Sequence, residues 1–331
     1  MIATSKAFAA SPESVQAKNS LIRPIVVFDG GNRTIQWIDP YGTVQVLPAF
    51  IKQIDPSWEE VEGSDRSLVI EHEGETFVIG HAAKDLNGTP VFQQNKTELA
   101  QKLVFAALEP NPGQPAVRIE RMIIALSSSK SDDTAFLKAI EGTHEFTRNS
   151  QRVIAHVRKV EPIDETRAAY TYATQQGLFR SGKNPNGVLD LGGGTSIARL
   201  YSTDGTLIRE ADVILPGTYD LARRIAARIT RDLPNSPDLS LIMDGIESGR
   251  YEIGTTGYCF QPAFDNARDA WLMEIRAAIK TRWAQWLSTL GEVLVIGGSA
   301  PLAMPLSEAT GGRFKIASHP QTISIIGMLG A

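Results

Sequence analysis

Three short apolar segments of this chain each lead into a turn of glycine and small polar residues. The turns are Asp29-Gly30-Gly31-Asn32, Asp190-Leu191-Gly192-Gly193-Gly194-Thr195 and Gly297-Gly298-Ser299. A hairpin tip of the Asp-x-Gly type directs backbone N–H groups and a small hydroxyl to one point, which suits phosphate, while its carboxylate suits Mg²⁺ and the waters of that ion. Two such tips would clamp a nucleoside triphosphate, and the Gly-Gly turn would let a flat ring and ribose approach the backbone.

Any one of these turns could also be an ordinary turn that follows a buried strand. The set of three, in this order and at this wide spacing, favours a nucleotide site. The Asp190–Thr195 turn is the most specific of the three, and the turn after Asp29 is the least specific on its own.

Composition excludes several classes of protein. A chain of 331 residues suits two domains. A net charge of −4 provides no basic field for nucleic acid or a membrane surface. The polar segment 1–20 has no apolar core of a secretory signal, and the single Cys259 fits a reducing compartment. We therefore expect a cytoplasmic protein that contacts neither DNA nor membrane directly.

Two other kinds of site fit the sequence poorly. Gly177-Leu178-Phe179-Arg180-Ser181-Gly182-Lys183 resembles a P-loop, but Asn184 stands where Ser or Thr would bind Mg²⁺. The segment also follows a helical pattern and precedes a strand, which is the reverse of the P-loop order. The five histidines show no metal-ligand spacing, so we expect no zinc site.

Strand-like and helix-like segments alternate along the chain, which predicts an α/β fold. We expect helices at 95–109, 163–176, 217–233 and 268–290. The strand after Asp29 and the strand after Asp190 both belong to hairpins with the same Asp-x-Gly tip. This echo indicates two related domains facing each other across a cleft. The Gly/Asn/Pro-rich segment 177–186 is the expected boundary between them.

Taken together, the three turns resemble those of the actin-like ATPase superfamily, which includes actins, sugar kinases and the heat-shock chaperone ATPase domain. The turns correspond to its first phosphate loop, second phosphate loop and adenosine motif, and Asp164–Tyr170 and Ile325–Met328 fit its connecting helices. The chain is most similar to the ParM-type bacterial plasmid-segregation actins, because it is short and because Phe77–Ala83 resembles the strand-turn of their small insert.

The resemblance implies an α/β, actin-like (ribonuclease H-like) two-domain fold with a central interdomain nucleotide cleft. The expected limits are a flexible tail at 1–22, domain I at 23–184 with an insert at about 59–98, domain II at 185–316, and a C-terminal helix at 317–331 that returns to domain I.

The resemblance also implies the role of each site residue. Asp29 and Asp190 would hold Mg²⁺ through waters. Backbone N–H groups of the two hairpin tips would bind the β- and γ-phosphates: Gly31, Asn32, Gly192, Gly193, Gly194 and Thr195. The adenosine of ATP, or the guanosine of GTP, would pack on Gly297, Gly298 and Ser299.

The chain departs from the family at two positions. Gln36 stands nearest the place where members often carry a phosphate-binding Lys. A Glu or Gln at the start of the first connecting helix orients the attacking water, and here Asp164 and Glu165 both fit that role. An ordinary helix start, with Asp164 as the cap and Glu165 in the first turn, also fits.

The implied function is an ATP-dependent, filament-forming bacterial actin homologue of plasmid or DNA segregation, with slow hydrolysis controlling the stability of the polymer. Its DNA partner would bind through an adaptor on centromere-like DNA, because no basic reading motif is visible. A small-molecule kinase and a non-polymerising nucleotide switch of the same superfamily are the alternatives.

Overall fold

The computed structural model describes residues 21–90, 101–126 and 134–330. The chain divides into two compact units, Met1–Glu165 and Thr166–Ala331, and each is taken here by itself. Predicted features at 1–20, 91–100 and 127–133 lie outside the described residues; they include most of the expected tail, the end of the insert and the start of the helix expected at 95–109.

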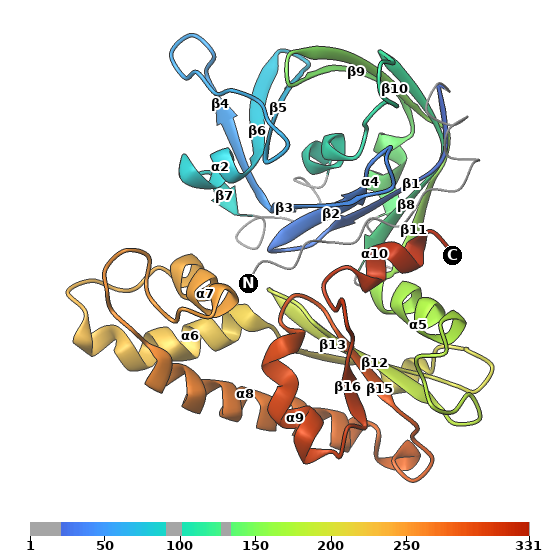
Figure 1. Ribbon diagram of the computed structural model, residues 1–331, viewed down its shortest axis with the longest axis vertical. Coiled ribbons are helices and arrows are strands. Elements are labelled where there is room, and N and C mark those ends of the chain that lie inside the picture. The colour runs from blue at the N-terminus through green and yellow to red at the C-terminus, as the bar shows by residue number, and fades with distance from the viewer. Residues whose placement is uncertain (1–20, 91–100, 127–133, 331) are drawn as a thin grey trace. The chain divides into compact units, whose positions relative to one another are not determined.

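The first unit is built on one large mixed sheet. Its strands are β1 (Ile22–Gly30), β2 (Thr34–Ile38), β3 (Val44–Pro48), β4 (Phe50–Ile54), β5 (Ser67–His72), β6 (Glu75–Gly80), β7 (Thr89–Pro90), β8 (Ala116–Leu126), β9 (Gly142–Arg148), β10 (Gln151–Val157) and β11 (Val160–Asp164). Among the described residues the order is β3-β2-β1-β8-β10-β9-β5-β6-β4-β7, with β11 paired to β8. Figure 1 shows this sheet curving strongly.

The helices α2 (His81–Asp85) and α4 (Thr134–Ile140) and the 3₁₀ turn η2 (Val104–Ala106) accompany this sheet in the described part of the unit. The core inside the curve contains Trp37, Phe77, Phe146 and the fully buried segment 103–108. The central strands β1 and β8 are parallel, so their carboxyl ends lie at the same edge of the sheet. Polar residues that follow these two strands therefore lie at one edge of the sheet.

The second unit has a sheet of order β14-β13-β12-β15-β16. Its strands are β12 (Asn186–Leu191), β13 (Thr195–Tyr201), β14 (Val213–Pro216), β15 (Val293–Ile296) and β16 (Phe314–Ile316). Successive residues of a strand point to opposite faces. Leu189 and Val295 accordingly belong to one core, while their neighbours Val188 and Leu294 belong to the other. Both faces of this sheet are therefore buried.

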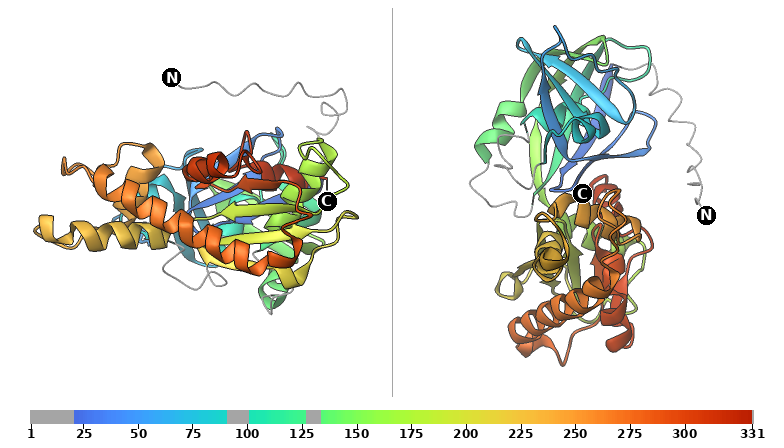
Figure 2. Two further views of the ribbon diagram at one scale, coloured as in Figure 1. Left: turned by 90° about the horizontal axis from the view of Figure 1, so that it is seen from below. Right: turned by 90° about the vertical axis from the view of Figure 1, so that its left-hand side faces the viewer.

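Helices cover both of these faces. The helices and 3₁₀ turns are α5 (Glu165–Gln175), η3 (Arg209–Ala211), α6 (Thr218–Ile229), η4 (Thr230–Asp232), α7 (Leu239–Ser248), α8 (Gln261–Arg282), η5 (Ala284–Trp286), η6 (Ala300–Ala303), α9 (Met304–Ala309) and α10 (Ile323–Met328). Residues of α6, α7 and α8 pack in one core, and residues of α5 and α10 pack in the other. Figure 2 shows α8 as a long helix along its side of the sheet.

The helices α5 and α10 touch backbone to backbone. A Cβ placed on Gly327 of α10 would lie 2.3 Å from the carbonyl oxygen of Ala168 in α5. Only glycine permits that approach. The C-terminal helix therefore packs on α5, which belongs mostly to the second compact unit.

The expected domain limits and the compact units differ. Sequence composition places the boundary at 184/185, while compactness places it after Glu165, because α5 packs on strands β12, β13 and β15. At the N-terminal end, β1 begins at Ile22, which the sequence analysis assigned to the tail. The predicted domains I and II stay a prediction, since compactness alone does not test them.

The mixed α/β architecture predicted from the alternating pattern is confirmed. Within the described ranges, every helix lacks either the length or the apolar character needed to cross a membrane.

Candidate functional site

The first predicted turn joins β1 to β2 in the first unit. Asp29 is the next-to-last residue of β1 and lies between Gln36 of β2 and Ala125 of β8 in the sheet register. A Cβ on Gly31 would lie 2.6 Å from the carbonyl oxygen of Thr34, so the turn closes only with glycine there. Gln36 is buried beside Asp29, with 5% of its surface exposed. A neutral amide thus stands next to the predicted magnesium-binding carboxylate.

The two candidate water-orienting residues lie where an unpredicted strand ends and a helix begins. We expected a helix from Ile163, whereas Val160–Asp164 forms β11, parallel to β8, and α5 begins at Glu165. In the sheet register Asp29 of β1 pairs with Ala125 of β8, and Asp164 of β11 pairs with the next residue of β8, Leu126. Since β8 separates β1 from β11, the backbones of Asp29 and Asp164 are about 10 Å apart.

The environments of these two acidic residues differ. Asp164 is buried, with 6% of its surface exposed, and occupies the position directly before α5. Glu165 is half-buried in the first turn of that helix. Both the capping position and the first turn of a helix favour acidic residues, so the arrangement fits the ordinary helix start as well as a catalytic one.

The second predicted turn has the same geometry as the first. Asp190 is the next-to-last residue of β12, as Asp29 is of β1, and three residues separate the strands in both hairpins. A Cβ on Gly192 would lie 2.4 Å from the carbonyl oxygen of Thr195, which repeats the contact between Gly31 and Thr34. The structure therefore supports the interpretation that one hairpin unit occurs twice.

The second turn is fixed by the start of α6. The backbone N–H of Thr218 donates to the carbonyl of Gly192 at 3.1 Å, and that of Tyr219 donates to the carbonyl of Gly193 at 2.7 Å. In a trans peptide, the C=O of one residue and the N–H of the next point in opposite directions. The N–H groups of Gly193 and Gly194 therefore both point away from α6. Consecutive N–H groups that point the same way form an anion-binding nest.

The third predicted turn lies against the second. A Cβ on Gly297, whose φ is +90°, would lie 2.4 Å from Oδ1 of Asp190. The backbone N–H of Ser299 donates to the carbonyl of Leu191 at 3.1 Å. The hydroxyls of Ser299 and Thr218 also hydrogen-bond to each other. The carboxylate, the glycine loop and the Gly-Gly turn thus meet at one place.

Within the second unit, the structure brings together all the predicted site residues of that unit, 190, 192–195 and 297–299. Within the first unit, Asp29, Gly31, Asn32 and Gln36 share one hairpin, and Asp164 ends a strand at the same edge of the sheet. Gly298 and Thr195 are exposed, and the three glycines at 192–194 are half-buried, so a ligand has access to these turns.

Two residues of this arrangement were missed from the sequence. Gly217 precedes α6, and a Cβ there would lie 2.6 Å from the carbonyl carbon of Gly194. Thr218 contributes both its N–H and its hydroxyl to the loop. The Pro216-Gly217-Thr218 sequence at the start of an amphipathic helix was the available signal, but it indicates only a helix start.

The donors present suit magnesium bound through water. Among the described residues, no group of three or more His, Cys, Asp and Glu is placed to hold a metal ion. Mg²⁺ in nucleotide sites commonly keeps several waters and takes its other ligands from one or two carboxylates and the phosphates. Asp29 and Asp190, each at a hairpin tip, fit that pattern and would not form a protein cage.

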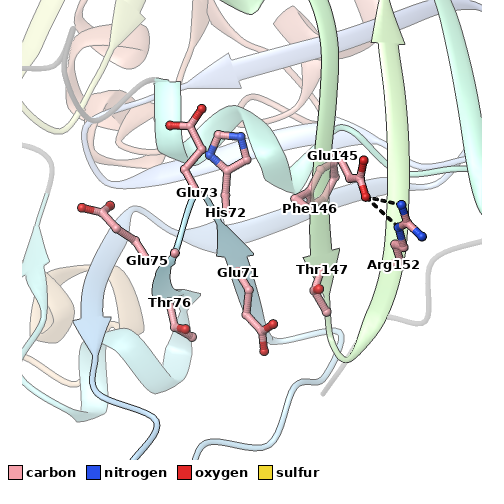
Figure 3. A pocket seen from close by; sticks show the side chains of 10 residues that line it. Glu71, His72, Glu73, Glu75, Thr76, Glu145, Phe146, Thr147 and Arg152 are labelled. Carbon is pink, nitrogen blue, oxygen red and sulfur yellow. Dashed lines mark hydrogen bonds and ion pairs between the residues drawn. The ribbon is translucent and has the colours of Figure 1, made fainter.

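A hollow of about 370 Å³ lies elsewhere in the first unit, between the β5–β6 hairpin and strands β9 and β10 (Figure 3). Its acidic lining residues are Glu71, Glu73, Glu75 and Glu145. Arg152 pairs with Glu145, and partial burial lowers the pKa of His72 below its ordinary value, so this imidazole adds little positive charge. The excess of carboxylates disfavours a phosphate ligand there.

Several solved structures that match this architecture are actin-like proteins. An apo ParM from pSK41 shares 16% identity with this chain at a TM-score of 0.66, covering 93% of this chain and 96% of that one. The archaeal actin homologue Ta0583, in complex with ADP, shares 14% at 0.73, covering 92% and 97%. A ParM from Clostridium botulinum, in a 15-stranded filament, shares 13% at 0.72, covering 92% and 97%.

No protein-family model and no curated protein matches the sequence. The structural matches establish the fold: the chain has a two-domain actin-like fold that resembles the ParM-type proteins, as the three turns predicted.

Proposed function

We propose that this protein is a Mg²⁺-dependent ATPase whose nucleotide state controls assembly into filaments, in the manner of a plasmid- or DNA-segregating actin. One observation carries the proposal. The Gly192–Thr195 loop turns two consecutive N–H groups away from α6, and Asp190 and Ser299 lie beside it. A nest, a carboxylate and an open Gly-Gly turn at one place are what a magnesium-bound nucleotide requires.

Both hairpins are proposed to bind phosphate. In the proposed site, N–H groups of Gly193, Gly194 and Thr195 bind phosphate oxygens, and Gly31 and Asn32 do the same in the first hairpin. Gly297, Gly298 and Ser299 pack on the adenosine. The ADP bound by Ta0583 supports ATP as the nucleotide. When bound, the ion neutralises phosphate charge, and Asp29 and Asp190 orient its waters.

We further propose that Glu165 orients the attacking water. Glu165 is the more exposed of the two candidates and sits in the first turn of α5, whereas Asp164 is buried before the helix. In phosphoryl transfer the protein mainly positions groups and stabilises charge, so a carboxylate that holds a water in line is sufficient for slow hydrolysis.

Self-association is the proposed output of hydrolysis. The Clostridium botulinum ParM and Alp12 both form filaments, and this chain shares their fold. An adaptor bound to centromere-like DNA would link the filament to its cargo, because the net charge of −4 gives the chain no overall basic field for direct binding. The proposed location is the cytoplasm.

The substitution Asp190→Asn tests the nucleotide site. It preserves the shape of the side chain that lies against Gly297 but removes its charge. Loss of a group that orients metal-bound water typically costs about 10–100-fold in metal affinity or activity. We expect Mg²⁺-dependent release of phosphate from ATP to fall by that factor, measured under steady-state conditions over a range of Mg²⁺ concentrations.

The matched control is Asp265→Asn, in α8, where the side chain is 51% exposed. It should hydrolyse ATP at the wild-type rate. Wild-type turnover in Asp190→Asn would contradict the site assignment. Transfer of phosphate to an added sugar or to acetate would instead favour the small-molecule kinase of the same superfamily.

A further inference from the structure

The first turn of α5 is hydrogen-bonded to strand β13. Thr166, the second residue of the helix, is completely buried. Its hydroxyl oxygen accepts a hydrogen bond from Nη1 of Arg199 at 3.0 Å and another from the Tyr201 hydroxyl at 3.1 Å. Arg199 and Tyr201 are two residues apart on β13, so their side chains leave the same face of the sheet.

The guanidinium of Arg199 is buried as well, with 4% of the residue exposed. A charge at that depth is costly unless it is paired and hydrogen-bonded. Its Nε lies 3.4 Å from Oδ2 of Asp212, in the connection between β13 and β14. The pairing holds the guanidinium in one place and thereby fixes the direction of its bond to Thr166.

Tyr201 strengthens the same junction. Its ring stacks on Tyr170 of α5, with centroids 4.0 Å apart and planes 18° apart. The guanidinium of Arg167 lies 5.9 Å from the centroid of the Tyr201 ring. The first two turns of α5 are therefore attached to β13 by hydrogen bonds, by stacking and by a cation–π contact.

The strand that holds α5 also ends the glycine loop. β13 begins at Thr195, the last residue of the proposed phosphate loop, and Arg199 follows four residues later on the same strand. Four residues of strand span about 13 Å. One rigid segment thus connects the loop to the helix turn that begins with Glu165.

We propose that Arg199, through the Thr166 hydroxyl, is a positioning residue that sets the first turn of α5, and with it Glu165, relative to the Gly192–Thr195 loop. The inference rests on the proposed ATPase function. A displacement of about 1 Å in a positioned group can slow a reaction by about 10²-fold. Neither Arg199 nor Thr166 belongs to the proposed nucleotide-binding set, so loss of their contact should slow turnover without weakening nucleotide binding.

The test is Thr166→Val, which keeps the shape of the side chain and removes the acceptor. We expect kcat for ATP hydrolysis to fall about 10-fold or more, while the Kd for Mg-ATP, measured with a fluorescent ATP analogue, stays within about 2-fold, a difference of about 0.4 kcal/mol. Thr166→Ser restores the hydroxyl and should restore kcat. If Thr166 contributed only to stability, its replacement would not lower kcat while leaving the Kd for Mg-ATP unchanged.

Thr174→Val is the matched control, because Thr174 lies two turns later in α5 and its hydroxyl bonds only back to the carbonyl of Tyr170 among the interactions described. It should leave kcat unchanged. Should Thr166→Val fail to fold, Arg199→Lys replaces it: this variant keeps a positive charge near Asp212 and removes the Nη1 donor to Thr166, and it should lower kcat in the same direction.

The outcomes are distinct. Wild-type kcat in Thr166→Val, or in Arg199→Lys if it is used instead, overturns the positioning role while leaving the ATPase intact. Parallel losses of kcat and of nucleotide affinity also overturn it. A wild-type protein that binds Mg-ATP without hydrolysing it, or that does not bind it, overturns the proposed function and this inference with it.

Discussion

Two adjacent acidic residues, Asp164 and Glu165, have different chemical options because one ends a strand and the other begins a helix. Asp164 is buried in the position before α5, where Asp and Asn cap a helix about equally well. Glu165 is half-buried and has a longer side chain. A capping role therefore tolerates Asp164→Asn, whereas a water-orienting role does not tolerate loss of the Glu165 carboxylate.

The substitution Glu165→Ala should slow ATP hydrolysis by about 10²–10⁴-fold, which is the usual cost of removing a group that acts on the attacking water. Nucleotide binding should be preserved, because Glu165 lies outside the phosphate loops. Single-turnover hydrolysis and equilibrium binding of Mg-ATP, measured on the same preparation, separate the two effects. Asp164→Asn is the control and should hydrolyse ATP normally. The opposite result, slow Asp164→Asn with normal Glu165→Ala, would assign the water to Asp164.

Residue types alone predicted the three turns, because each group of glycine and small polar residues directly follows an apolar run and the three occur as a set. They did not predict Gly217 and Thr218. Their role depends on which backbone groups the start of α6 meets, and these contacts join residues more than 20 positions apart in the sequence. The choice between Asp164 and Glu165 was left open for a similar reason, since the boundary between β11 and α5 falls between them.

At the scale of elements, the glycine loop depends on how closely α6 approaches it. The backbone of Gly217 has φ −88° and ψ −173°, which any residue adopts, so the need for glycine there is purely steric. A Cβ at this position would lie 2.7 Å from the backbone nitrogen of Thr195 as well as 2.6 Å from Gly194. Backbone atoms cannot rotate away as a flexible side chain does, so the loop or the helix must move.

We therefore expect Gly217→Ala to weaken Mg-ATP binding by about 10-fold or more, because overpacking of this kind typically costs about 1–3 kcal/mol. Isothermal titration of Mg-ATP measures the change. Gly182→Ala is the matched control: its Cβ would meet no atom within 4 Å, and its φ is not in the left-handed region. Equal affinities of the two variants would show that the loop does not bind nucleotide, or that α6 does not position it.

Helices with a strong hydrophobic periodicity were predicted from the sequence, and helices with a weak sequence signal were not. The stripe of Leu221, Ile225 and Ile229 identified α6, although the expected helix 217–233 ends as a 3₁₀ turn after Ile229. α8 begins at Gln261, seven residues before the expected start, because Phe264 and Ala267 are buried. α7 was missed, but Asp238, whose carboxylate accepts a hydrogen bond from the Ser240 N–H at 2.7 Å, was a usable start signal.

At the scale of the whole molecule, the repeated hairpin explains why so much of the architecture could be inferred from so few residues. Asp29 and Asp190 occupy equivalent positions in two hairpins of equal loop length, one in each compact unit. A hairpin unit that occurs twice in one chain predicts a chain of two domains. The exact division of the chain was not predictable, because the packing of α5 on β13 joins residues 166–175 to the second unit.

The wild-type protein should assemble into filaments on addition of Mg-ATP and disassemble as the nucleotide is consumed. A fold that binds a triphosphate and hydrolyses it slowly exists in two nucleotide states, and a ligand shifts an equilibrium only by its different affinity for the two states. If filament ends bind a subunit with ATP more tightly than a subunit with ADP, ATP promotes assembly and its hydrolysis promotes disassembly. The ParM and Alp12 filaments show that this fold supports polymers.

Sedimentation and electron microscopy at several protein concentrations test this expectation. With Mg-ATP, pelleted protein should rise above a critical concentration and then decline as phosphate is released. A slowly hydrolysed ATP analogue should remove the decline, and Glu165→Ala should do the same with ATP itself, because both hold the triphosphate state. A protein that stays monomeric with ATP, with the analogue and with a crowding agent, while still hydrolysing ATP, would defeat the filament proposal and leave a nucleotide switch that does not polymerise.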